Sequence, residues 1–334
     1  MREALHYDAL DGKRVQCHLC RHECEIEDGG TGLCQVRQNR GGTLYSLVYD
    51  RVSSMGVDPI EKKPFFHVRP GTGSLSIATV GCNLQCRYCQ NHSLSQAPRR
   101  GGISGRPIPP AAIAAEARDR RCASIAYTYS EPTIFYELAR DTMEAAGRFG
   151  VLNVWVTNGF MGAEVLEEMS GLLAAANVDV KSFRDTFYKK ICKARLAPVL
   201  DNVARMRELG IWVEVTTLVI PGYNDDEAEL RDLAAWIASV DRSMPWHVSR
   251  FHPDNELLDA GPTPVRTLSR ARDIGREAGL EYVYTGNVPG DEGESTFCPA
   301  CSARLVERVG FTVGENRLKS GKCPECGHAI AGKW

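Results

Sequence analysis

The chain has 334 residues, of which 43% are apolar and 25% are charged, and its formal net charge is −2. This near-neutral balance lacks the basic footprint of a protein that binds nucleic acid or an anionic membrane. No apolar run approaches the ~18–20 residues that cross a bilayer, and residues 1–8 lack the hydrophobic core of a signal peptide. We therefore expect a cytoplasmic protein that binds neither nucleic acid nor membrane.

Residues 1–73 are rich in glycine, cysteine and charge, and we predict an irregular N-terminal module there. Its four cysteines are Cys17, Cys20, Cys24 and Cys34. In a reducing compartment, clustered cysteines indicate metal ligation rather than disulfides. Four thiolates can hold zinc or an auxiliary iron–sulfur cluster, and the sequence leaves both open, as well as unmetallated thiols. His18 or His22 could replace one cysteine.

The segment from Asp58 to Pro64 reads Asp-Pro-Ile-Glu-Lys-Lys-Pro. It has no mechanism that follows from the residues themselves. Charged residues of this kind most often belong to a solvated surface, and we expect the same here.

Residues 74–290 alternate short runs of β-branched residues with longer amphipathic stretches. The runs expected to be strands are Leu75–Val80, Ser124–Tyr127, Asn153–Thr157, Val178–Val180, Ile211–Val219, His247–Phe251 and Tyr282–Tyr284. The stretches expected to be helices are Ala111–Arg121, Thr133–Phe149, Ala163–Ala175, Leu200–Leu209, Asp226–Ser239 and Val265–Ala278. This alternation predicts βα units around a parallel sheet, and therefore a complete or partial βα barrel. The barrel would use all seven strands, or six of them with one strand outside it.

The first of these strands leads into three cysteines, Cys82, Cys86 and Cys89, with C-x3-C-x2-C spacing and no fourth cysteine nearby. A [4Fe–4S] cluster has four irons, so three thiolates leave one iron with an open position. An open position separates catalytic metal sites from closed structural ones. The alternatives are a zinc knuckle closed by His92, or free buried thiols.

The last 44 residues, 291–334, contain two C-P-x-C pairs, Cys298/Cys301 and Cys323/Cys326. Two such pairs typically form a four-cysteine zinc site, with mononuclear iron as the rival for the same cage. We predict a zinc-ribbon or rubredoxin-like module with a structural metal. The remaining cysteines, Cys122 and Cys192, are expected to be small core residues.

The C-x3-C-x2-C motif, with an aromatic residue before its last cysteine, resembles the signature of the radical SAM superfamily. In that family the open iron binds the amino and carboxylate groups of S-adenosylmethionine (SAM). The resemblance implies SAM contacts at the ends of the next strands, listed here in chain order: Tyr129, Ser130, Glu131, Thr157, Asn158, Asp179, Lys181 and His252. Tyr129 and Ser130 stand where the family has two glycines. From the residues alone, these positions could equally be a helix cap, a tight turn, an ion pair and a structural histidine.

The resemblance extends along most of the chain, including Cys17–Cys20, Asp58–Pro64, Thr128–Pro132 and the terminal module. Together these segments resemble the AmmeMemoRadiSam-system radical SAM enzymes, which are similar to activating enzymes of glycyl-radical proteins such as pyruvate formate-lyase. The implied fold is α/β, an open (βα)6 TIM-like partial barrel. The implied activity is reductive cleavage of SAM to a 5′-deoxyadenosyl radical, which abstracts hydrogen from an unidentified substrate.

Two other readings remain open. The first is a glycyl-radical activase whose substrate is a partner protein. The second is a non-catalytic zinc-ribbon binding protein, which leaves the central cysteine loop unexplained. Radical SAM chemistry also needs an external electron donor similar to flavodoxin or ferredoxin.

Overall fold

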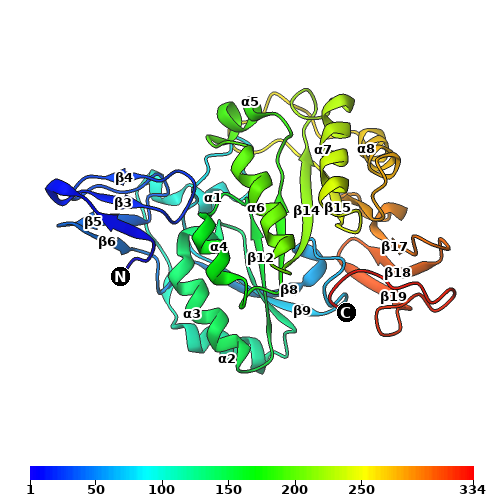
Figure 1. The fold of residues 1–334 in the computed structure, drawn as a ribbon, viewed down its shortest axis with the longest axis horizontal. Coiled ribbons are helices and arrows are strands. Elements are labelled where there is room, and N and C mark those ends of the chain that lie inside the picture. The colour runs from blue at the N-terminus through cyan, green and yellow to red at the C-terminus, as the bar shows by residue number, and fades with distance from the viewer.

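The computed structural model describes all 334 residues. Three parts follow one another along the long axis of the molecule: small antiparallel sheets at the N-terminal end, a large sheet with helices in the middle, and a small C-terminal sheet (Figure 1). None of the helices combines the length and the apolar character that crossing a bilayer requires.

The N-terminal end is built from two three-stranded antiparallel sheets, with strand orders β1-β6-β5 and β2-β3-β4. Their strands are β1 (Arg2–Glu3), β2 (Tyr7–Ala9), β3 (Val15–Cys17), β4 (Glu25–Ile26), β5 (Arg37–Arg40) and β6 (Thr43–Ser46). A further two-stranded pair joins β7 (Arg51–Val52) to β10 (Arg106–Pro107).

The central sheet has eight strands in the order β16-β15-β14-β13-β12-β11-β9-β8. Its strands are β8 (Ser54–Pro59), β9 (Gly73–Ala78), β11 (Ser124–Tyr127), β12 (Leu152–Thr157), β13 (Ala175–Asp179), β14 (Trp212–Val219), β15 (Trp246–Arg250) and β16 (Val283–Gly286). The seven strands from β9 to β16 are parallel, which confirms the predicted parallel sheet. The edge strand β8 is antiparallel to β9, so the hydrogen-bonded sheet begins at Ser54, inside the predicted N-terminal module.

Helices connect the parallel strands, as the alternating pattern predicts. They are α1 (His92–Ser95), α2 (Pro110–Asp119), α3 (Tyr136–Gly147), α4 (Ala163–Met169), α5 (Asp185–Phe187), α6 (Ala197–Glu208), α7 (Glu227–Val240) and α8 (Val265–Glu277). The predicted helix over 163–175 ends at Met169 in the structure; a turn over residues 170–172 follows, and Ala175 begins β13, which pairs with β12 and β14. The stretch before α3 is a 3-10 turn, Pro132–Phe135.

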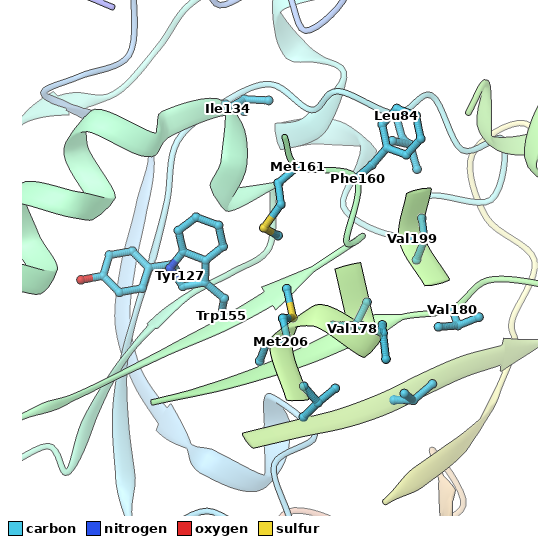
Figure 2. Packing of buried hydrophobic residues seen from close by; sticks show 14 of the residues in the cluster. Leu84, Tyr127, Ile134, Trp155, Phe160, Met161, Val178, Val180, Val199 and Met206 are labelled. Atoms are coloured by element: carbon cyan, nitrogen blue, oxygen red, sulfur yellow. The ribbon is translucent and has the colours of Figure 1, made fainter. Parts of the chain in front are cut away.

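The main hydrophobic core lies between the helices and one face of the sheet. Figure 2 shows Trp155, Met161 and Met206 gathered in this layer. Alternate residues of the same strands face the other way: Ala126, Val154 and Ala175 form a second buried cluster with the segment from Ile60 to Val68. This period of two is what a strand buried on both faces requires.

The C-terminal sheet contains β17 (Thr296–Phe297), β18 (Arg304–Val309) and β19 (Thr312–Asn316). Its small core includes Phe66 and Tyr284, so it packs on the central part of the molecule. The last residues add a short parallel bridge, in which Lys333 donates to the carbonyl of His67 (2.7 Å) and accepts from Arg69 (2.9 Å).

A buried ion pair connects the N-terminal sheets to helix α3. Arg37 Nη2 on β5 lies 3.0 Å from Glu137 Oε1, and both side chains are at most 1% exposed. Glu137 also accepts the backbone N–H of Leu5 (2.9 Å). Removing one partner of such a pair leaves an uncompensated buried charge.

We expect Glu137→Gln to lower the free energy of unfolding by about 3–5 kcal/mol, because Arg37 keeps its charge without a partner. The double variant Arg37→Met/Glu137→Gln removes both charges and should recover much of that loss. Arg205→Met, which breaks an exposed pair with Glu167, should cost no more than about 1 kcal/mol. Urea unfolding followed by circular dichroism tests this order; equal losses in all three variants would contradict it.

Candidate active site

The three cysteines of the C-x3-C-x2-C motif follow β9 on a loop that begins with a constrained glycine. Gly81 has φ +105°, and a Cβ there would lie 2.7 Å from Val36 Cγ1 and 3.2 Å from the carbonyl oxygen of Cys34. Only glycine combines this backbone with so close an approach. The loop therefore packs closely against the N-terminal module at the point where it leaves the sheet.

Backbone hydrogen bonds hold the other side of the loop. Gln85 N donates to the carbonyl of Cys192 (2.9 Å) and Arg87 N to that of Ile191 (3.1 Å). Cys192 ends a π-helical turn, Tyr188–Cys192, and its buried sulfur lies 3.9 Å from the hydroxyl of Tyr88. Cys192 is thus a buried core residue that also supports the cysteine loop.

Cys82, Cys86 and Cys89 all line one cavity of about 430 Å³, and no other cysteine lines it. A cluster held at this loop would keep one iron free of protein thiolate, so the donor set fits a [4Fe–4S] cluster with an open position. Around it the loop supplies the apolar side chains of Leu84 and Tyr88. Cys89 Sγ also lies 3.2 Å from Ser95 Oγ.

Glu131, at the end of β11, ties two strand ends together. Its carboxylate accepts four hydrogen bonds: from the amide and hydroxyl of Thr133 (3.1 and 2.6 Å), the hydroxyl of Thr157 (2.7 Å) and the amide of Asn158 (2.8 Å). Burial raises the pKa of Glu131, although these donors oppose the rise. The carboxylate fixes the positions of Thr157 and Asn158 at the cavity wall.

Tyr129 takes the left-handed backbone conformation (φ 65°) that favours glycine, the residue of the related motif at this position. Holding a non-glycine residue there costs about 1–2 kcal/mol. Its hydroxyl donates to Asp58 and accepts from Lys63 Nζ (2.9 Å), and its ring lies 4.2 Å from that ammonium. These contacts hold Tyr129 in place.

The Asp58–Pro64 segment is therefore not the solvated surface that its charges predicted. Lys63 is 1% exposed and bonds Asp58 (2.8 Å), and Glu61 is equally buried. Burial alone would raise the pKa of Asp58, but the hydrogen bonds that it accepts from Lys62, Lys63, Tyr129 and Ser76 lower it far below 3.8. Burial lowers the pKa of Lys63 to about 8, against the opposing effect of Asp58. The segment turns inward because its charges are paired beneath the sheet.

The cavity gathers most of the residues for which SAM contacts were expected. Seven of the eight line it: Tyr129, Ser130, Glu131, Thr157, Asn158, Asp179 and Lys181. Lys181 Nζ is paired with Asp179 (3.0 Å), and Asn158 Nδ2 bonds the side chain of Asn83 (2.7 Å) next to Cys82. The hydroxyl of Ser130 is buried and has no hydrogen-bond partner.

His252 does not belong to this group. It is exposed and lies outside the cavity lining, because the chain leaves the sheet after Arg250. The histidine in the cavity is His247, the second residue of β15, whose Nε2 lies 2.7 Å from Glu214 on β14. The only sequence signal for His247 was its place in a predicted strand, beside the predicted strand that carries Glu214.

Glu61 and the β18–β19 turn of the C-terminal sheet form a second wall of the cavity. Glu61 Oε1 accepts from Gly71 N (2.9 Å) and lies 3.7 Å from Arg308 Nε on β18, while Oε2 is buried without a partner. Gly310 and Phe311, in the β18–β19 turn, line the same cavity. The C-terminal module thus contributes directly to the site.

The four C-terminal cysteines form a compact group. All four sulfurs lie within 4.8 Å of one another, with Cys298–Cys326 at 3.6 Å and Cys301–Cys323 at 3.7 Å. A tetrahedral ion with metal–sulfur bonds of about 2.3 Å separates its ligands by about 3.8 Å. These four thiols fit a closed single-metal site.

The N-terminal cysteines also meet. Cys17, Cys20, Cys24 and Cys34 together line a small cavity of about 20 Å³, with Leu19 and Ile134 among its other walls. His22 borders the cavity as well, whereas the exposed His18 pairs with Asp8 (3.0 Å).

Comparisons with known proteins agree with this geometry. Residues 76–234 match the family model of the radical SAM superfamily. The uncharacterized protein MJ0808 of Methanocaldococcus jannaschii is 45% identical over 333 residues, which cover 99% of each chain.

Solved structures resemble parts of the fold at low sequence identity. SuiB of Streptococcus suis bound to S-adenosylmethionine has a TM-score of 0.50 and 12% identity, over 65% of this chain and 51% of SuiB. A domain of pyruvate-formate lyase-activating enzyme from Bacteroides vulgatus has a TM-score of 0.44 and 20% identity, over 49% of this chain and 99% of that domain. At these identities the likeness concerns the fold alone.

Asp58→Asn should lower the free energy of unfolding by about 1.5–3 kcal/mol at pH 7, because several donors lose a charged acceptor. The folded-state pKa of Asp58 lies below 3.8, so its contribution is full above pH 4 and fades as acid protonates it. The gap between wild type and variant should therefore be constant from pH 7 to 5 and shrink below pH 4.

Thermal unfolding monitored between pH 3 and 7 measures this gap. Glu116→Gln, which breaks the exposed pair with Arg120, is the control and should change stability by no more than about 0.5 kcal/mol. A gap for Asp58→Asn that stays constant down to pH 3 would contradict the assignment.

Proposed function

Because this chain belongs to the radical SAM superfamily, we propose that it reductively cleaves SAM and uses the resulting radical to abstract hydrogen from a small-molecule substrate. One observation carries the proposal. Three cysteines, with no fourth, share a single cavity with seven residues from other strand ends that carry the expected SAM contacts.

Cys82, Cys86 and Cys89 would hold a [4Fe–4S] cluster, and their loop is anchored on both sides before any ligand arrives. When bound, the cluster and SAM supply one-electron cleavage of the S–C5′ bond and a 5′-deoxyadenosyl radical. The chain's own contribution is orientation and the exclusion of side reactions.

Two side chains are suited to bind the polar groups of SAM. Ser130 offers a buried hydroxyl without a partner, and the Lys181 ammonium can pair with a carboxylate. The Glu131 carboxylate already accepts hydrogen bonds from Thr133, Thr157 and Asn158, so its larger role is to position the strand ends. The backbone that carries Ser130 is set by the left-handed turn at Tyr129.

The dimensions of the cavity favour a small substrate over a peptide loop. Sites for small molecules typically measure about 300–1,000 Å³, and this cavity of about 430 Å³ must accommodate the cluster and SAM as well as the substrate. The wall of the same cavity that contains Glu61, His247 and Glu294 suits a polar substrate. A glycyl-radical activase acting on a partner protein is the alternative, and it would require this wall to open.

Further parts of the proposal concern architecture and partners. The open edges at β8 and β16, with the cavity at the strand ends, support a TIM-like partial barrel in which β9 to β15 supply the six strands. The motifs quoted above support the AmmeMemoRadiSam-system subfamily. The electron would come from an external donor similar to flavodoxin or ferredoxin.

For the C-terminal cysteines we propose a structural zinc ion. The sulfur–sulfur distances of 3.6 and 3.7 Å suit tetrahedral thiolate coordination, and all four ligands come from the protein. The ion would stabilise the sheet whose Phe311 and Gly310 line the cavity.

SAM cleavage can be tested on the full chain. Anaerobically reconstituted protein given dithionite and SAM should release 5′-deoxyadenosine, whereas Cys86→Ala should release none because one iron ligand is lost. Cys122→Ser is the matched control, since Cys122 is a buried cysteine outside all three groups, and it should retain activity. Wild-type protein that binds iron and SAM but releases no 5′-deoxyadenosine would defeat the proposal.

Metal analysis tests the zinc site. Purified protein should contain one zinc per chain, and Cys298→Ser/Cys323→Ser should lose it together with thermal stability, because binding energy at a structural site is folding energy. Cys122→Ser should keep the zinc. Retention of zinc by the double variant, or iron in its place in the wild type, would refute the assignment.

A further inference from the structure

The N-terminal cysteine module lies directly against the proposed radical site. Arg21 N donates to the carbonyl of Phe160 (3.1 Å), and Gly162 N to that of Leu19 (3.0 Å), so the Cys17–Cys24 turn pairs with the loop after β12. A Cβ at Gly162 would lie 2.4 Å from the carbonyl oxygen of His18. This loop follows Asn158, one of the cavity residues.

Two side chains connect the two cysteine loops. Arg99 Nη2 donates to the carbonyl oxygen of Leu33, next to Cys34, and to that of Cys82 (3.4 Å). His22 Nε2 bonds the carbonyl of Asn83 (2.8 Å). Together with the close approach of Gly81 to Cys34, these contacts hold the two cysteine loops side by side.

The N-terminal thiols differ in spacing from the zinc-like C-terminal group. They surround a small cavity with walls from Leu19, Leu33 and Ile134. No three of their sulfurs lie within 4.8 Å of one another, a limit that all four C-terminal sulfurs meet. A single ion draws four sulfurs to about 3.8 Å, whereas in a cluster the thiolates bind different irons and stand further apart. The sulfurs of Cys82, Cys86 and Cys89 share this wider spacing.

We propose that Cys17, Cys20, Cys24 and Cys34 hold an auxiliary iron–sulfur cluster that relays electrons to the cluster at Cys82, Cys86 and Cys89. The proposal rests on the function proposed above for the second site. An external one-electron donor reduces the N-terminal cluster, which then passes that electron to the neighbouring cluster and returns to its oxidised state. Four thiolates saturate the N-terminal cluster, so it binds no SAM.

The first test removes the radical site. The triple variant Cys82→Ala/Cys86→Ala/Cys89→Ala, reconstituted anaerobically with iron and sulfide, should retain iron and sulfide. After reduction with dithionite it should give a paramagnetic signal that SAM does not change. A triple variant that contains zinc and no iron would overturn the inference.

The second test removes the relay. Cys20→Ser/Cys34→Ser should lose the iron of one cluster, about half if both are [4Fe–4S], and keep a signal that SAM changes. Dithionite should still reduce it, but reduction by flavodoxin should be lost. Cys122→Ser, the control, should keep all its iron and its reduction by flavodoxin. If flavodoxin reduces Cys20→Ser/Cys34→Ser as fully as it reduces Cys122→Ser, the relay is overturned.

The two proposals fail in different ways. Wild-type protein that holds a single cluster and still releases 5′-deoxyadenosine would overturn the auxiliary cluster and leave the proposed function standing. If the triple variant holds a SAM-insensitive cluster but the wild-type protein releases no 5′-deoxyadenosine, the proposed function is overturned and the auxiliary cluster stands. Circular dichroism of each variant shows whether it is folded, and the triple variant leaves the N-terminal cysteines untouched.

Discussion

The close approach between Gly81 and the Cys34–Val36 segment is the contact on which the site depends. It brings a loop from the central sheet and a turn from the N-terminal sheets to a distance at which a single Cβ would collide with Val36. Close-packed interiors transmit such displacements instead of absorbing them. Both cysteine groups are therefore positioned by one shared surface, and Arg99 and His22 add polar contacts across it.

Buried charge is the second organising feature. Asp58 with Lys63, Glu61 with Arg308, and Glu214 with His247 are paired beneath or beside the cavity, and they come from β8, the following turn and three more strands. Desolvating such groups costs several kcal/mol for each ion, which their partners offset only in good geometry. Arrangements of this kind are common where a site needs fixed polar groups.

The parallel sheet followed from the sequence because β-branched runs and amphipathic stretches have different periods. The cysteine loop could be predicted as a metal site because three thiols at that spacing have few uses other than holding a metal. The burial of Glu61 and Lys63 could not be predicted, because charged residues on a short turn are normally exposed to solvent. Their partners Arg308 and Tyr129 also lie far away in sequence. His252 was expected at the site because it follows a predicted strand, but β15 ends at Arg250 and His252 is exposed, whereas His247 inside the strand lines the cavity.

The wall of the cavity made by Gly310 and Phe311 has a consequence for biosynthesis. The floor that it faces, near Glu61 and Phe66, is translated some 240 residues earlier. During elongation, chains generally fold from the N-terminal side. The nascent polypeptide therefore carries the Cys82 loop and the strand ends of the sheet while one flank still lies open to solvent. During that interval the thiols of the loop are exposed on the side that the β18–β19 hairpin later covers.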